Sequence, residues 1–173
     1  MTRHRAFAAL LATGLLACAT LSHAQYREPE VWVEAPVPAP TDWKLERVVE
    51  FTLGSASTPL RFGIDPLTLS VGSDGVVRYV FVARSPSGAV NALFEGIRCK
   101  TAEVRVYARW DPDGKRWLPG LSGDGAWQAL DNRGATRRAM QVARGGVCDG
   151  AAPNRSPELI LDMLRNGRKD LKP

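Results

Sequence analysis

The chain has 173 residues, and its 24% charged and 45% hydrophobic content is typical of one ordinary globular domain that can bury a core without a metal. Its formal net charge is +5, and this falls to +3 without the two arginines of the N-terminal segment described next. A charge that small, with the acids spread along the chain, argues against a nucleic-acid partner.

The first 24 residues have the organisation of a secretory signal peptide. Arg3 and Arg5 make a short basic start without acids, and residues 6–17 are uncharged. That stretch is too short to cross a bilayer, which takes roughly 20 helical residues. The Ser-His-Ala sequence at 22–24 suits a signal peptidase, so the mature chain would begin at Gln25 in the periplasm, and no transmembrane helix is expected.

A second interpretation of the same segment is a lipoprotein signal. The sequence Leu-Leu-Ala-Cys at 15–18 resembles a lipobox, and cleavage there would remove residues 1–17 and leave Cys18 as a lipidated first residue. Acyl chains on Cys18 would tether the protein to a membrane. Both cleavage sites stay open at this stage, so the protein is expected in the periplasm, either soluble or anchored.

Two cysteines, Cys99 and Cys148, remain once Cys18 is removed or lipidated. An even pair in an oxidising compartment predicts a structural disulfide. Closing a loop of about 50 residues would stabilise the fold by about 4 kcal/mol in the chain-entropy model. The sequence has no Cys-x-x-Cys motif, which argues against a redox pair.

Residues 25–42 form a proline-rich stretch, with prolines at 29, 36, 38 and 40. This spacing favours an extended, polyproline-like backbone, and we interpret the stretch as a semi-rigid spacer. Trp32, between two valines, suggests that part of it docks on the domain. A spacer after Cys18 suits an anchored protein.

Residues 43–168 are predicted to form a single α+β domain. The expected strands cover residues 48–53, 67–71, 76–83, 89–99, 103–110 and 116–118, separated by turn sequences such as Asp74-Gly75. Gly96 is expected to mark a bulge or a close approach. The clearest alternation is Val104, Val106, Ala108 and Trp110, which predicts a strand with one buried face.

Two helices are expected after the strands. Residues 135–144 suit a short helix that ends at Gly145-Gly146, and Ser156-Pro157 is a typical helix start, followed by an apolar stripe at Leu159, Ile160, Met163 and Leu164. The fold expected is therefore an antiparallel β meander of four to six strands followed by two C-terminal helices. Residues 169–173 form a basic tail.

The mature domain contains no histidine, because His4 and His23 both precede Gln25. This excludes Ser-His-Asp and Cys-His nucleophiles and histidine metal sites, and the P-loop and Gly-x-Ser-x-Gly motifs are also missing. Asp111-Pro-Asp-Gly indicates a turn rather than a calcium loop. No metal or cofactor is expected.

Glu95 is the remaining candidate for chemistry, because it lies inside an otherwise apolar strand. Buried beside a second carboxylate, it could serve a histidine-free hydrolase. Otherwise it pairs with Arg84, Arg98 or Arg105 across the sheet, or it faces water. Pairing or exposure is the simpler interpretation.

Three other side chains, Arg98, Trp110 and Trp117, complete the candidate binding residues. The tryptophans could stack on a sugar or peptide, although in a small domain such residues more often belong to the core.

Two blocks of the sequence resemble the cryptic neisserial protein-like family. Ser85-Pro-Ser-Gly-Ala-x-Asn91 runs into Glu95-Gly-Ile-Arg-Cys99, and residues 69–79 fit as well. The resemblance covers most of residues 51–164. It implies an exported protein, since members are thought to be periplasmic or lipoproteins, and it supports pairing of Cys99 with Cys148. The family has no assigned activity, so it supplies no catalytic residue.

These observations together favour a non-catalytic binding or interaction domain of the cell envelope. The expected partner is an unidentified envelope protein or polymer. The alternative is a hydrolase with a carboxylate pair that includes Glu95.

Overall fold

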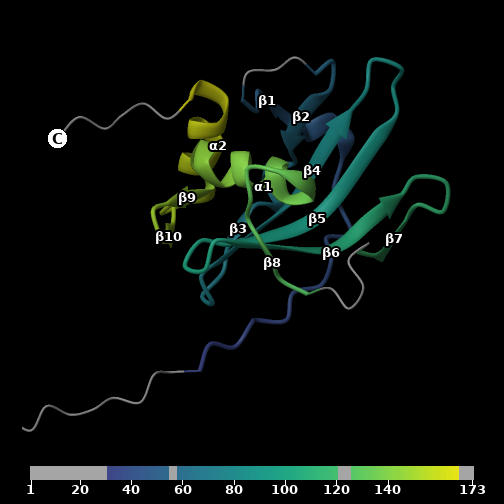
Figure 1. Cartoon of the computed structure of the whole chain (residues 1–173). Helices are drawn as coiled ribbons and strands as arrows, with labels where there is room; N and C mark the ends of the chain where they lie inside the picture. The colour runs from purple at the N-terminus through teal and green to yellow at the C-terminus, as the bar shows by residue number, and fades with distance from the viewer. Residues whose placement is uncertain (1–30, 55–57, 121–125, 168–173) are drawn as a thin grey trace, which may run out of the picture. The chain divides into compact units, whose positions relative to one another are not determined.

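The computed structural model describes residues 31–54, 58–120 and 126–167 (Figure 1). From Trp32 onward the described chain belongs to one compact unit. The paragraphs below concern that unit.

Antiparallel pairing joins eight described strands into one sheet, with the order β1-β2-β4-β5-β6-β7, while β3 pairs with β4 and β8 with β6. The strands are β1 (Val49–Phe51), β2 (Arg61–Ile64), β3 (Ser70–Val71), β4 (Val76–Arg84), β5 (Val90–Arg98), β6 (Glu103–Asp111), β7 (Arg116–Pro119) and β8 (Gln128–Ala129). The longest strands, β4 to β6, form its centre. A separate small hairpin is made by β9 (Cys148–Asp149) and β10 (Ala152–Pro153).

Two α-helices follow the long strands and cover one face of the sheet (Figure 1). They are α1 (Arg137–Val142), which continues as the π-helical turn η4 (Ala143–Val147), and α2 (Pro157–Asn166). Short 3₁₀ turns are η1 (Leu45–Arg47), η2 (Pro66–Thr68) and η3 (Gly134–Thr136). The predicted α+β fold, an antiparallel sheet followed by two C-terminal helices, is confirmed.

The start and end of α2 follow the predicted signals. The Ser156 hydroxyl accepts a hydrogen bond from the Leu159 amide at 3.3 Å, and Pro157 occupies the first turn. Ile160, Met163 and Leu164 are buried, whereas Leu159 is only partly buried. The apolar stripe is therefore narrower than the sequence indicated.

The strand expected at residues 67–71 is mostly a turn. The Asp65 carboxylate accepts a hydrogen bond from the Leu67 amide at 3.2 Å, and Pro66 starts the 3₁₀ turn η2. Only Ser70 and Val71 then pair with β4. The capping carboxylate and the proline override the weak alternation of leucines, and Leu67 is left 70% exposed.

The helix expected at residues 135–144 is shorter in the structure, where the α-helical part is α1 alone. The chain then continues as the π-helical turn η4. Its end packs tightly against α2, because a Cβ on Gly146 would lie 2.7 Å from the Cβ of Met163. A residue without a side chain is required at this contact, which accounts for the glycine at position 146.

The sheet has a hydrophobic core on each face. On the helix side, Val77, Tyr79 and Phe81 of β4 pack with residues of α1 and α2. On the second face, Val80 and Val82 pack with residues that include Trp43 and Leu45, which precede β1. The residues that precede β1 therefore cover part of the second face of the sheet.

The expectation that Val104, Val106, Ala108 and Trp110 share one face is wrong. Phe94 pairs with Ala108 but its neighbour Glu95 pairs with Val106, so Tyr107 is an extra residue in β6. A bulge of one residue moves the following side chains to the opposite face. Val104 consequently belongs to the helix-side core, and Ala108 and Trp110 belong to the core of the second face.

Gly96 is the close-approach point that the sequence indicated. A Cβ there would lie 2.7 Å from the Tyr107 hydroxyl and 2.9 Å from Val76. The missing side chain makes room for the ring of the bulged tyrosine.

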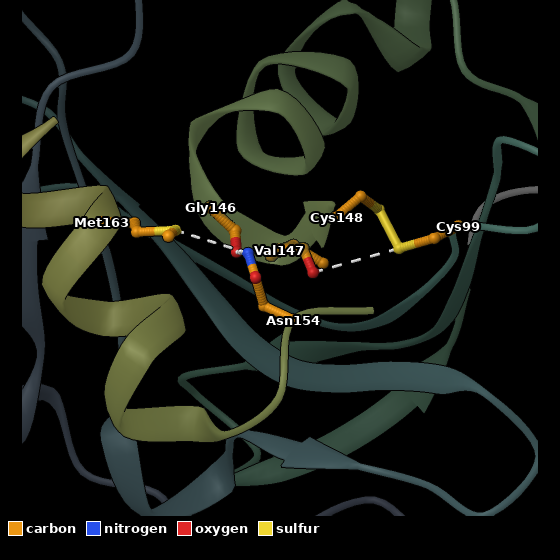
Figure 2. Close-up of a disulfide and its surroundings, with 6 residues drawn as sticks. All are labelled: Cys99, Gly146, Val147, Cys148, Asn154 and Met163. Carbon is orange, nitrogen blue, oxygen red and sulfur yellow. Dashed lines mark hydrogen bonds between the residues drawn. A yellow bond between two sulfur atoms is a disulfide. The ribbon is translucent and has the colours of Figure 1, made fainter. Parts of the chain in front are cut away.

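The predicted disulfide between Cys99 and Cys148 is present, with the two Cα atoms 5.6 Å apart. It joins the residue after β5 to the start of β9, directly after η4 (Figure 2). Beside it, the Asn154 amide donates a hydrogen bond to the carbonyl of Gly146. The bridge therefore attaches the end of the helical segment to the sheet.

Among the residues that the structure describes, no helix is both long and apolar enough to cross a membrane.

Candidate functional site

Glu95 is completely buried on the helix side of β5. Its two carboxylate oxygens accept hydrogen bonds from the two terminal nitrogens of Arg138 in α1, at 2.7 and 2.5 Å. The partner of Glu95 is thus a residue of a helix. It is none of the three sheet arginines, at positions 84, 98 and 105, that the sequence analysis offered. The Arg138 guanidinium also lies 4.1 Å from the centre of the Phe81 ring. An ion pair with two parallel hydrogen bonds neutralises the buried carboxylate.

Tyr79 lies opposite Glu95 on β4, and its hydroxyl is buried without a hydrogen-bonding partner of suitable geometry. Burial, together with the negative charge of Glu95, raises the pKa of Tyr79 well above its ordinary value. The phenol stays protonated at neutral pH. Among the described residues, the ionisable groups that interact with Glu95 are Arg138 and the neutral phenol of Tyr79, and neither is the second carboxylate that a hydrolase would need.

Trp110 and Trp117, two of the candidate binding residues, belong to an aromatic cluster with Trp43. Ring centroids of Trp43 and Trp110 are 5.2 Å apart, and those of Trp110 and Trp117 are 5.3 Å apart. The Trp117 indole also donates a hydrogen bond to the carbonyl of Pro40 at 2.7 Å. The structure brings these tryptophans together as half-buried core of the second face.

Arg98, the fourth candidate, holds the chain that precedes the domain. Its guanidinium stacks on the Trp32 ring at 3.7 Å from the centroid, and it lies 3.8 Å from Glu103. The Trp32 indole donates a hydrogen bond to the carbonyl of Asp74 and packs edge-on against Trp127. Arg98 is thus engaged within the protein by Trp32 and Glu103.

Glu34 is a functional-looking residue that sequence reasoning missed. Its carboxylate accepts hydrogen bonds from Arg105 at 2.6 Å, from the Tyr107 hydroxyl at 2.7 Å and from the Trp127 indole at 3.1 Å. Burial opposes ionisation, but these donors outweigh it and lower the pKa of Glu34. Trp32 and Glu34 point toward the domain, and Val33 between them is exposed. This alternation in the sequence was the signal that could have indicated a docked segment.

Asp74 and Arg78 hold Ala35, the residue that follows Glu34. The Asp74 carboxylate accepts hydrogen bonds from the Ala35 amide at 2.9 Å and from Arg78 at 2.6 Å, while Arg78 also donates to the Ala35 carbonyl. Burial of Asp74 would raise its pKa, but these hydrogen bonds and that from the Val76 amide lower it to about 2.

Residues 32–45, here called the N-terminal segment, therefore lie on the second face of the sheet. The N-terminal segment includes the later part of the stretch that the sequence analysis interpreted as a spacer. The expected docking of Trp32 on the domain is present, through Asp74 and Arg98. Residues 25–30 lie outside the described part of the chain. So do the signal segment with Cys18 and the basic tail at 169–173, so their roles stay predictions.

An open cleft of about 480 Å³ lies on the other side of the molecule, between β2, the β4–β5 hairpin and the start of α1. It is here called the arginine cleft. Its apolar residues are Leu53, Leu60, Phe62, Ala83 and Ala135, and its polar residues are Thr58, Asn91, Arg137, Arg138 and Gln141. No acidic side chain lines it in the described structure. Sequence reasoning did not find it, because its parts are distant in the chain.

No group of three or more His, Cys, Asp or Glu side chains that could hold a metal occurs within the described ranges. The absence of a metal or cofactor stays a prediction.

These features define a small, disulfide-bonded α+β domain whose buried charges are paired with one another. The sequence of the CNP1-like family matches residues 27–165, and the chain belongs to this family. The match confirms the resemblance seen in the sequence, and it covers the sheet, α1, all of α2 except its last residue, and the disulfide. No curated protein and no solved structure matches the chain.

Proposed function

We propose that this protein is exported to the periplasm and works there as a non-catalytic binding domain of the cell envelope. The observation that supports this most is the closed pair of Glu95 and Arg138. The one acid that the sequence singled out for chemistry is bound on both oxygens by an arginine. Both carboxylate oxygens of Glu95 are therefore engaged inside the fold.

The other buried acids support the same proposal. Asp65 is completely buried and lies 2.7 Å from Arg47, and Asp74 is paired with Arg78 at 2.6 Å. Buried charges that are satisfied by partners of the same fold serve its structure. A catalytic acid or base instead needs a proton-accepting or proton-donating atom within reach of a substrate.

Export is supported by the signal-like segment and by the disulfide. A basic start, a short apolar stretch and a small-residue cleavage site precede the domain. A bridge between Cys99 and Cys148 suits an oxidising compartment. Cleavage before Gln25 would give a soluble periplasmic protein, and cleavage before Cys18 would give a lipid-anchored one.

Cross-linking in intact cells, followed by fractionation and intact-mass measurement, tests this proposal. We expect a chain that begins at Gln25 or at an acylated Cys18, in the envelope fraction, together with a discrete adduct to one envelope protein or polymer. A chain that retains Met1, remains in the cytoplasm and has free thiols would overturn it. Alkylation without prior reduction reports on the thiols.

A further inference from the structure

The arginine cleft has an apolar floor that stays accessible. Leu60 is 40% exposed and Phe62 is only partly buried, and both face the cleft with Leu53 and Ala83. Its volume of about 480 Å³ falls within the range of small-molecule sites, which hold roughly 300–1,000 Å³. The floor can therefore cover the apolar part of a small ligand.

The rim of the cleft carries an arginine held in place from below. Arg138 uses two N–H groups for the buried Glu95, and a guanidinium has five. Its side chain is 23% exposed and lines the cleft. Glu95 thus fixes the direction of a guanidinium whose remaining donors are available to an anionic oxygen.

Arg137 supplies the net charge of the rim. It is exposed at the start of α1, and within the described residues it makes no hydrogen bond or ion pair. Because Arg138 is neutralised by Glu95 and no described carboxylate lines the cleft, Arg137 leaves one uncompensated positive charge there. The amides of Asn91 and Gln141 add neutral donors beside it.

From this arrangement we infer that the arginine cleft binds a free single-chain amphiphile with an anionic head group, such as a carboxylate. The head would lie against Arg137 and Arg138, and the chain would lie over Leu60 and Phe62. The inference rests on the proposed function, because it assumes that this domain binds its ligand without converting it. A neutral ligand would leave the charge of Arg137 unused.

The test uses the mature, disulfide-bonded chain and dodecanoate below its micelle concentration, with binding followed by calorimetry and amide NMR. Dodecyl maltoside supplies the same chain with a neutral head, and acetate supplies the same head without the chain. We expect saturable 1:1 binding of dodecanoate alone, with NMR shifts confined to residues of the cleft.

Matched variants separate the cleft from the rest of the surface. Arg137→Gln should weaken dodecanoate binding about tenfold, since a hydrogen bond to a charged group contributes about 1.5 kcal/mol or more. Leu60→Asn should weaken it several-fold through lost apolar contact. Arg155→Gln and Leu67→Asn change an exposed arginine and an exposed leucine outside the cleft, and should leave binding unchanged.

The inference is overturned if dodecanoate does not saturate, if dodecyl maltoside binds equally well, or if both control variants weaken binding as much as the cleft variants. Sedimentation with vesicles of anionic phospholipid, without binding of free dodecanoate, would assign the surface to a bilayer and would also overturn it. These failures leave the proposed function intact, because that function is contradicted by conversion of a substrate and not by lack of this ligand.

Discussion

Glu95 in the middle of β5 and Arg138 in the first turn of α1 form a buried ion pair with two hydrogen bonds, at 2.7 and 2.5 Å. The pair joins residues 43 positions apart and connects the helical layer to the sheet. The Arg138 guanidinium also stacks on the ring of Phe81, which belongs to the helix-side core. A charge in the core thus positions α1 and orients a guanidinium at the arginine cleft.

Loss of one partner of this pair should destabilise the fold strongly. Arg138→Met leaves an uncompensated carboxylate in a fully buried position, so we expect the free energy of unfolding to fall by about 3 kcal/mol. Urea denaturation followed by circular dichroism measures this change.

The double variant Glu95→Leu with Arg138→Met supplies the control. It removes both charges, so its cost should be smaller than that of Arg138→Met alone. If the single variant were as stable as the wild type, the ion pair would not hold α1 on the sheet.

The N-terminal segment should stabilise the domain. A chain that begins at Thr41 loses the contacts of Trp32, Glu34 and Ala35, so we expect it to lose roughly 3 kcal/mol or more. A chain that begins at Val31 keeps them and supplies the comparison. Equal melting temperatures for the Thr41 and Val31 chains would show that the segment does not stabilise the fold.

Acid should weaken the attachment of the same segment. The pKa of Asp74 is about 2 in the folded protein, below its ordinary value of 3.8, so its stabilising contribution is complete above about pH 4 and is lost as the pH falls toward 2. This contribution is on the order of 2 kcal/mol. The pKa of Glu34 is also lowered, which gives the same sign.

Tryptophan fluorescence and denaturation at pH 6, 4 and 2 measure this loss, since Trp32 and Trp127 lie in the contact. In Asp74→Asn the fall between pH 4 and 2 should be smaller than in the wild type. An identical pH profile for the two proteins would contradict the role assigned to Asp74.

Removal of the disulfide should cost about 4 kcal/mol, because the bridge closes a loop with a sequence separation of 49. Cys99→Ser with Cys148→Ser should therefore unfold at a lower temperature and lower urea concentration than the oxidised wild type. Reduction of the wild type should give the same change, and an unaltered midpoint in both experiments would contradict a structural role for the bridge.

Local signals in the sequence predicted the fold well. The Asp74-Gly75 turn, the long β-prone strands and the Ser156-Pro157 start are determined by neighbouring residues, so they could be recognised without the fold. The two cysteines could also be paired, because no other cysteine remains in the mature domain.

Features that depend on distant parts of the chain were not predictable in the same way. The partner of Glu95 comes from a helix, and the sequence offered several nearer arginines. The bulge at Tyr107 reverses the faces of the strand that alternated most clearly, and only the pairing with β5 reveals it. The arginine cleft likewise exists only once α1 lies beside β2.

Whether Glu95 serves structure or catalysis decides between a binding domain and a hydrolase. The most direct measurement is mass-spectrometric analysis of isolated envelope polymers and proteins after incubation with the wild-type chain or with Glu95→Gln, which keeps the size of the side chain. A non-catalytic binding domain predicts identical products from the wild type and from a folded Glu95→Gln chain. Cleavage products that form with the wild type and disappear with a folded Glu95→Gln chain would contradict the proposed function.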